Sequence, residues 1–160
     1  EALTFADKVV VMHDGRVVQM GTPEELFDLP AHTFVGYFIG SPGMNVLPAR
    51  IEGDRAVLDN GEIGLAGMYP ALDGKTEIGV RPEFVTLTDA PHGLPVRVNR
   101  IEDVGRHRIV RADFLGNAIN VVVPEGLEIG ADMTRVIFDP ARVNVYQNDW
   151  RVTPNGERAA

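Results

Sequence analysis

Five arginines fall within one short stretch of the chain and offer the clearest opportunity for ligand chemistry. They are Arg97, Arg100, Arg106, Arg108 and Arg111, and they are interleaved with Glu102 and Asp103. Guanidinium groups bind carboxylates and phosphates through paired N–H donors, so this stretch could form an anion pocket or contact an acidic partner. The same side chains could instead lie on a solvated strand face and pair with nearby acids. We favour the solvated face and keep the anion site as an alternative.

A second candidate is the segment Gly79-Val80-Arg81-Pro82-Glu83, which carries opposite charges on either side of a rigid proline. Its guanidinium group could anchor a loop or a neighbouring subunit through a carboxylate, or could pair with the glutamate beside it. The spacing does not choose between these interpretations. The candidate subunit or regulatory contacts are therefore Gly79, Arg81, Pro82 and Glu83.

No residue pattern indicates catalysis or a bound cofactor or metal. Gly74-Lys75-Thr76 lacks the glycine that a phosphate loop requires five residues earlier, where Tyr69 stands, so an ordinary turn is predicted. The histidines are His13, His32, His92 and His107, and none has the spacing of a metal site. The chain has no cysteine, and its only serine, Ser41, lies in a Pro-Gly loop without the context of a nucleophile.

The first 43 residues predict a hairpin followed by two short helices. Two apolar β-branched runs flank Asp14-Gly15, a strong turn signal. Thr22 is a candidate helix cap, Pro23 fits the first helical position, and the helix should continue to Pro30. A second helix is predicted from apolar residues at helical spacing that end at Gly40. A segment of this length is too short to form an independent core. We therefore expect it to pack on the rest of the chain, to exchange with a second copy, or to be partly disordered.

The remainder is predicted to be mainly β, a sandwich or barrel, because short alternating runs are separated by turn dipeptides. It also contains a weak internal repeat that indicates two similar modules. At one constant offset, Ile78, Val80, Pro82, Val85 and Leu87 match Val136, Phe138, Pro140, Val143 and Val145. Residues 148–160 are polar and predicted to form a flexible tail, with Trp150 as its one candidate for docking.

Charge and hydropathy exclude two broad classes. The formal net charge is −8, which repels a phosphate backbone and argues against nucleic-acid binding. The apolar run at 9–12 is far shorter than the roughly 20 residues of a membrane-spanning helix.

Three stretches resemble the end of the ATPase subunit of ATP-binding-cassette (ABC) importers of the maltose and glycerol-3-phosphate type. They are residues 1–12, 15–25 and 34–45. The segment Gly79–Glu83 resembles the signature of the accessory domain that follows in this family, called TOBE, an OB-fold-like β-barrel of two similar halves. The resemblance implies three parts: residues 1–43 from the end of the nucleotide-binding domain, residues 44–147 as the TOBE domain, and the flexible tail 148–160.

The resemblance also implies a function for the parent protein. It would bind ATP and magnesium, pair with a second copy or a paralogous ATPase subunit, and dock on permease subunits at the cytoplasmic face of the membrane. The family's catalytic motifs would precede this fragment, which alone would bind no cofactor and hydrolyse no ATP, and would mediate dimer contacts and regulation. The solute would be glycerol, glycerol 3-phosphate or a maltose-like sugar, with a preference for the polyol end. The alternative is a stand-alone OB-fold module that binds a small molecule or oxyanion.

Overall fold

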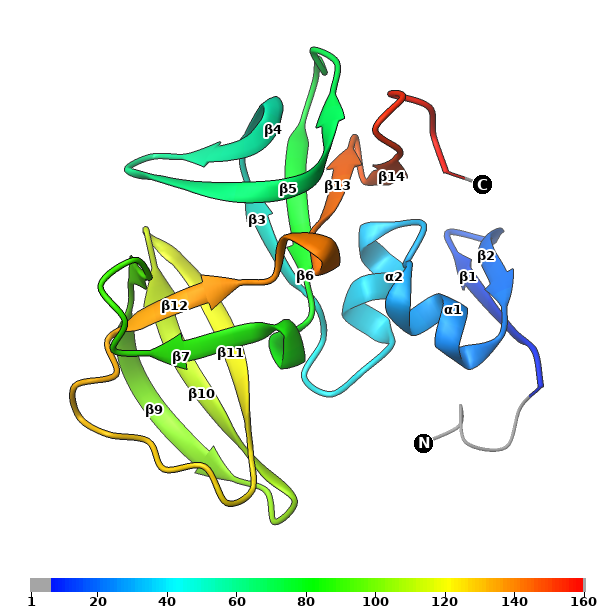
Figure 1. The fold of residues 1–160 in the computed structure, drawn as a ribbon. Helices are drawn as coiled ribbons and strands as arrows, with labels where there is room; N and C mark the ends of the chain where they lie inside the picture. Colours follow the sequence, from blue (N-terminus) through cyan, green and yellow to red (C-terminus); the bar gives the residue numbers. More distant parts are fainter. Residues whose placement is uncertain (1–6, 160) are drawn as a thin grey trace.

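The computed structural model describes residues 7–159. A hairpin and two helices precede a larger β part, with a short strand near the end of the chain (Figure 1). The first elements are β1 (Val9–His13), β2 (Arg16–Gly21), α1 (Pro23–Asp28) and α2 (Thr33–Phe38). The expectations that concern residues 1–6, including the start of the first resembling stretch, and residue 160 lie outside the described residues.

The β part follows without a long helix. Its first half holds β3 (Asn45–Pro48), β4 (Arg50–Leu58), β5 (Gly61–Tyr69), β6 (Thr76–Val80), the 3-10 turn η2 (Pro82–Phe84) and β7 (Val85–Thr88). Its second half holds β8 (Leu94–Pro95), β9 (Arg97–Asp103), β10 (His107–Phe114), β11 (Asn117–Pro124), β12 (Arg135–Phe138), the 3-10 turn η3 (Pro140–Arg142), β13 (Asn144–Gln147) and the closing strand β14 (Trp150–Val152).

The predicted hairpin and both helices are confirmed. Asp14 and Gly15 have φ values of 52° and 74°, the left-handed conformation that a tight two-residue hairpin turn requires. Thr22 accepts a hydrogen bond at 3.2 Å from the backbone N–H of Glu25, so it caps α1 as predicted. The helix ends at Asp28, shortly before the proline expected to stop it.

The first segment buries a small apolar cluster of its own and leaves other apolar side chains exposed. The cluster consists of Val11, Leu26, Val35 and Ile39. The exposed apolar residues of the hairpin are Val10, Met12, Val17 and Met20, and Phe38 of α2 is 68% exposed. Of the three arrangements expected for this segment, the structure adopts packing against the β part.

The internal repeat corresponds to two similar structural units that exchange strands. The units β6–η2–β7 and β12–η3–β13 have the same order of strand, 3-10 turn and strand. Strand β6 pairs with β13, and β7 pairs with β12, both antiparallel. The register joins Ile78 to Val145 and Leu87 to Val136. The repeat matches Ile78 with Val136 and Leu87 with Val145, so the paired positions Ile78–Val145 and Leu87–Val136 are equivalent in the two units. Each unit therefore pairs its strands with those of the other.

The prediction of a mainly β fold built from two similar halves is confirmed, with an open architecture. The sheets have the orders β14-β13-β6-β3, β7-β12-β8, β11-β10-β9 and β4-β5, and within residues 44–159 they do not join into one closed ring. A side chain bridges one gap: Asn45 of β3 donates to the carbonyl of Asn120 in β11 at 2.9 Å and accepts from its N–H at 2.8 Å. One apolar core, which includes Leu47, Ile78, Phe114, Val121 and Val136, lies under all these sheets.

Residues 148–159, which the sequence predicts to be a flexible tail, form regular contacts with the rest of the chain. Strand β14 extends the four-stranded sheet by pairing with β13. The N–H of Arg151 donates to the carbonyl of Ala31 at 2.9 Å, and Trp150 packs edge-on against His32 with ring centroids 4.7 Å apart. The polar composition suggested fraying, but the backbone groups of the tail find partners in the loop before α2. Trp150 therefore docks on the first segment.

The helices of the described chain have six residues each. Within residues 7–159, none has the length and apolar character needed to span a bilayer.

Candidate functional site

Arg81 joins the two helices to the β part. It leaves the end of β6, and its guanidinium donates to three carbonyl groups: Nε to Phe27 at 3.0 Å, Nη1 to Gly36 at 2.9 Å, and Nη1 to Ile39. These carbonyls belong to the last turns of α1 and α2, where the helix itself supplies no N–H partner. One side chain therefore satisfies the ends of both helices.

The guanidinium group of Arg81 is buried where it contacts the two helices. Arg81 is 3% exposed, and its Cζ lies 4.4 Å from the centre of the Phe27 ring. Loss of water lowers the pKa of Arg81, and the nearby Glu83 acts in the opposite direction. Nη2 is buried without a hydrogen-bond partner in the described chain. The cation is thus held by helix carbonyls and an aromatic face.

The Gly79–Glu83 segment, which we expected to contact a second subunit, lies largely inside the chain. Gly79, Arg81 and Pro82 are buried inside the chain, and only Glu83 is exposed. Arg81 does anchor a loop, as one interpretation proposed, but through backbone carbonyls rather than a carboxylate. The segment therefore makes contacts within the chain, and Glu83 is its exposed residue.

Tyr146 of β13 makes a second buried connection. Its hydroxyl donates to the carbonyl of Pro30 at 2.8 Å and lies 3.7 Å from the sulfur of Met44. Burial raises the pKa of Tyr146 well above its ordinary value, so the phenol stays protonated and remains a donor. Arg81 follows β6 and Tyr146 lies on the neighbouring β13; Arg81 contacts the ends of both helices, and Tyr146 contacts the loop between them.

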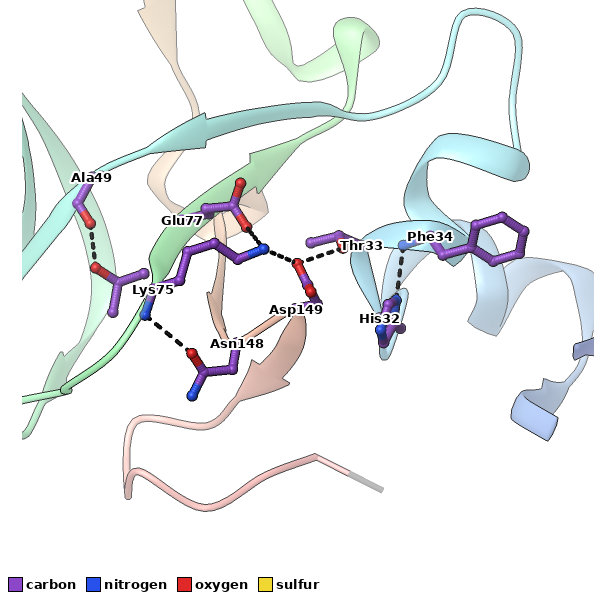
Figure 2. Close-up of polar contacts among 9 residues, drawn as sticks. His32, Thr33, Phe34, Ala49, Lys75, Glu77, Asn148 and Asp149 are labelled. Carbon is purple, nitrogen blue, oxygen red and sulfur yellow. Dashed lines mark hydrogen bonds and ion pairs between the residues drawn. The ribbon is translucent and has the colours of Figure 1, made fainter. Parts of the chain in front are cut away.

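A third connection is polar and more exposed (Figure 2). Lys75 Nζ lies 2.5 Å from Asp149 Oδ1 and 3.8 Å from Glu77, and the hydroxyl of Thr33 lies 3.3 Å from the same Asp149 oxygen. The N–H of Lys75 also donates to the side chain of Asn148 at 3.1 Å. Lys75 precedes β6 and Thr33 begins α2, so this cluster ties the closing strand to both parts. We call these three contacts together the junction.

The arginines of the second half do not converge. Arg97 contacts Asp113, Arg100 and Arg111 both contact Glu102 at 2.9 Å, and Arg108 donates to the carbonyl of Leu127. Arg106 is exposed and has no ion pair within residues 7–159. The cavities beside Arg97 and Arg108 are separate. Local pairs of this kind match the solvated strand face that we favoured, and the geometry offers no shared pocket for an anion.

Comparison with known proteins assigns the family. No family model matches the chain. It is 48% identical over 150 residues to the sn-glycerol-3-phosphate import ATP-binding protein UgpC of Ruegeria sp. (strain TM1040), and this match covers 93% of the chain and 42% of that protein. It is 33% identical over 154 residues to the sulfoquinovosyl glycerol transport ATP-binding protein SmoE of Agrobacterium fabrum, covering 91% and 43%. An ABC transporter ATP-binding protein of Sinorhizobium fredii, y4oS, is 40% identical over 134 residues, covering 81% and 36%.

The chain belongs to the family of ABC importer ATP-binding proteins. It spans less than half the length of the curated relatives it matches. In residues 7–159 of this family member, no three histidine, cysteine, aspartate or glutamate side chains gather in a way that could hold a metal ion.

Sequence reasoning missed most of the residues that build the junction in this importer subunit. Tyr146 lies just beyond the repeat, and nothing in its neighbourhood indicated a polar role. Asp149 was placed in a fraying tail, and Lys75 was considered only as part of a phosphate loop. One sequence feature could have indicated the junction. Arg81 and Pro82 directly follow an apolar strand, and an arginine that is buried at such a position needs several hydrogen-bond acceptors.

The free energy of unfolding at acid pH should depend on the Lys75–Asp149 contact of the junction. The hydrogen bond from Lys75 lowers the pKa of Asp149 below its ordinary value of 3.8. A carboxyl with a lowered folded pKa stabilises the fold above the unfolded pKa, and this contribution is lost as the pH falls through the folded value. We expect Asp149→Asn to lower the free energy of unfolding by less than about 1 kcal/mol at neutral pH, since the site is partly exposed. The free energy of unfolding of the variant should also fall less steeply between about pH 4 and pH 2 than that of the unaltered chain. Urea titrations across that range, with Asp54→Asn as an exposed control, would measure this, and an unchanged acid limb would contradict it.

Proposed function

We propose that this chain is the C-terminal accessory and regulatory part of the ATPase subunit of an ABC importer for a sugar or polyol, and that it does not hydrolyse ATP itself. The observation that carries the proposal is the match to importer ATP-binding proteins over 93% of the chain at up to 48% identity among the relatives described. The relatives named for sn-glycerol 3-phosphate and sulfoquinovosyl glycerol favour a glycerol-containing solute over a maltose-like sugar.

The junction supports a mechanical role for the accessory part. Arg81, Tyr146 and Lys75 attach the helical segment to three different places on the β part, and two of these contacts are buried. A segment held at several points moves with its neighbour as a rigid body rather than through a flexible linker. In this proposal, residues 7–43 belong to the nucleotide-binding domain, so a movement of that domain carries the β part, a TOBE domain, with it.

Regulation then follows from differential binding. A ligand or partner that binds the β part more tightly in one arrangement of the subunits favours that arrangement, and the linkage acts equally in the other direction. The proposed parent binds ATP and magnesium in the portion that precedes this chain, pairs with a second ATPase subunit, and docks on permease subunits at the cytoplasmic face of the membrane. Glu83 is the exposed residue of the Gly79–Glu83 segment that remains a candidate contact in that pair.

A chimera tests the proposal. The segment of the Ruegeria protein that aligns with this chain would be replaced by it, and sn-glycerol 3-phosphate uptake measured in cells that lack their own ATP-binding subunit. We expect the chimera to restore uptake, because the two segments share 48% of their residues. The Ruegeria protein truncated before the segment serves as the control.

The junction can be tested in the same assay. Arg81→Ala in the chimera should reduce uptake several-fold, while Arg50→Ala, which removes an exposed arginine, should leave it unchanged. A chimera that accumulates to normal levels yet transports no better than the truncated protein would contradict the proposed function.

A further inference from the structure

A groove between the hairpin, the loop before α2 and the closing strand gathers cationic and aromatic side chains. Its volume is about 540 Å³. The residues that define it are His13, Arg16, His32, Trp150 and Arg158, with Asp14, Val17 and Val18 completing the lining. This groove lies away from the arginine-rich strands of the second half and shares no lining residue with the cavities there.

Neither of the two arginines of the groove has an acidic partner within residues 7–159. In a chain of net charge −8, most arginines of the described part contact a carboxylate or a carbonyl, yet Arg16 and Arg158 form no ion pair or side-chain hydrogen bond within residues 7–159. The only carboxylate in the lining, Asp14, lies 3.5 Å from His13. The groove therefore carries an excess of positive charge.

Arg158 is held in a geometry suited to an oxyanion. Its Cζ lies 3.4 Å from the centre of the Trp150 ring, so the guanidinium is stacked on the indole. Stacking fixes the plane of the group and leaves its N–H donors at the edge, where they match the paired oxygens of a phosphate or carboxylate. Trp150 is itself fixed by its edge-on contact with His32.

His32 adds a neutral donor beside the cations. Its Nδ1 accepts a hydrogen bond from the N–H of Phe34 at 3.0 Å, so the proton of the neutral ring is on Nε2. Burial lowers the pKa of His32, and Asp149 opposes this shift, while His13, Arg158 and Lys75 reinforce it. The ring is thus a neutral N–H donor at neutral pH, and the positive charge of the groove comes from its two arginines.

From these observations we propose that the groove binds a small oxyanion, a phosphate or carboxylate group that is free or part of a small metabolite, between Arg16 and Arg158 with His32 as an additional donor. The site is independent of ATP hydrolysis and of the proposed import function. Because the groove is lined by both the hairpin and the closing strand, a bound anion would add a further contact between the first segment and the β part.

The test is a calorimetric titration of the chain with inorganic phosphate and, separately, with succinate, against sodium chloride at matched ionic strength. We expect binding of one of the two anions at concentrations of about 0.1 to 10 mM, with chloride producing no saturable heat. Phosphate alone, or succinate alone, identifies the preferred oxyanion. Binding should also shift the His32 ring resonances in NMR spectra more than those of His92, which lies outside the groove.

Three groove variants and one control variant decide whether the groove is responsible. Arg16→Ala and Arg158→Ala should each weaken binding about ten-fold or more, because each removes a charge-assisted contact. Arg158→Lys keeps the charge but loses the flat paired donors, so an intermediate loss is expected. Arg106→Ala removes an exposed arginine elsewhere and should have no effect.

Two results would overturn the proposal. One is the absence of saturable binding of either anion to the folded chain at about 10 mM. The other is an equal loss of affinity in Arg106→Ala and in the groove variants, which would indicate attraction to overall charge. Circular dichroism of each variant confirms that it is folded before affinities are compared, and Arg158→Lys provides the comparison if Arg158→Ala does not fold.

Discussion

Arg81→Ala is expected to lower the free energy of unfolding by about 3 kcal/mol, because it removes the side-chain donor of the Phe27 and Ile39 carbonyls and leaves the Gly36 carbonyl with the N–H of Met44 alone. For a chain of this length, the corresponding fall in thermal midpoint is roughly 6 to 12 °C. Calorimetry or urea unfolding would measure it. The matched control is Arg50→Ala, which removes an exposed arginine and should change stability by less than about 0.5 kcal/mol.

Hydrogen exchange would locate the effect of Arg81→Ala. Amide protection should fall most in α1 and α2, whose terminal carbonyls lose the guanidinium donor, and least in the β10–β11 hairpin. Arg81→Lys should recover only part of the loss, since a single ammonium cannot reach carbonyls on both helices with fixed geometry. Uniform loss of protection, or a variant as stable as the Arg50→Ala control, would mean that Arg81 does not join the two parts.

Phe114→Ala should destabilise the chain by about 3 to 5 kcal/mol, because it empties a fully buried position in the β core. The ring of Phe114 packs against Phe138 of β12 at 5.2 Å between centroids, so the cavity lies between β10 and β12 in the second half of the β part. Phe114→Leu is the conservative control and should cost much less, since it keeps most of the volume. Urea unfolding monitored by Trp150 fluorescence and by far-ultraviolet circular dichroism would measure both.

Combining Arg81→Ala with Phe114→Ala tests whether the first segment and the β part unfold together. Phe114 and Arg81 share no contact in the described structure, so their costs should add within about 0.5 kcal/mol if unfolding is one transition. A Phe114→Ala variant in which α1 and α2 keep full protection would contradict the attachment at the junction. The same variant should unfold the first segment along with the β part.

Local features of this fold could be predicted from the sequence because local rules decide them. Asp14-Gly15 requires a turn, Thr22 requires a cap, and the alternation of apolar residues requires strands. The repeat identified two similar units from residues alone. It could not indicate that β6 pairs with β13 and β7 with β12, because such pairing depends on which strands meet after the chain has collapsed.

The candidate site was less predictable for a related reason. The sequence left open whether Arg81 anchors a loop, contacts a neighbouring subunit or pairs with Glu83. The actual acceptors are backbone carbonyls within residues 27–39. The types of the side chains do not indicate which backbone carbonyls lack an N–H partner in the helices. Similarly, Arg16 and Arg158 lie at opposite ends of the chain, so only the folded structure reveals that they line one groove.

The exchange of strands between the two halves affects how the protein can be made. During synthesis, β6 emerges long before β13, and β7 long before β12, so the first half leaves the ribosome with open strand edges that only later residues can cover. Translation must deliver residues up to Gln147 before either unit is complete. A nascent chain of this protein therefore exposes unpaired strand edges while its second half is being synthesised.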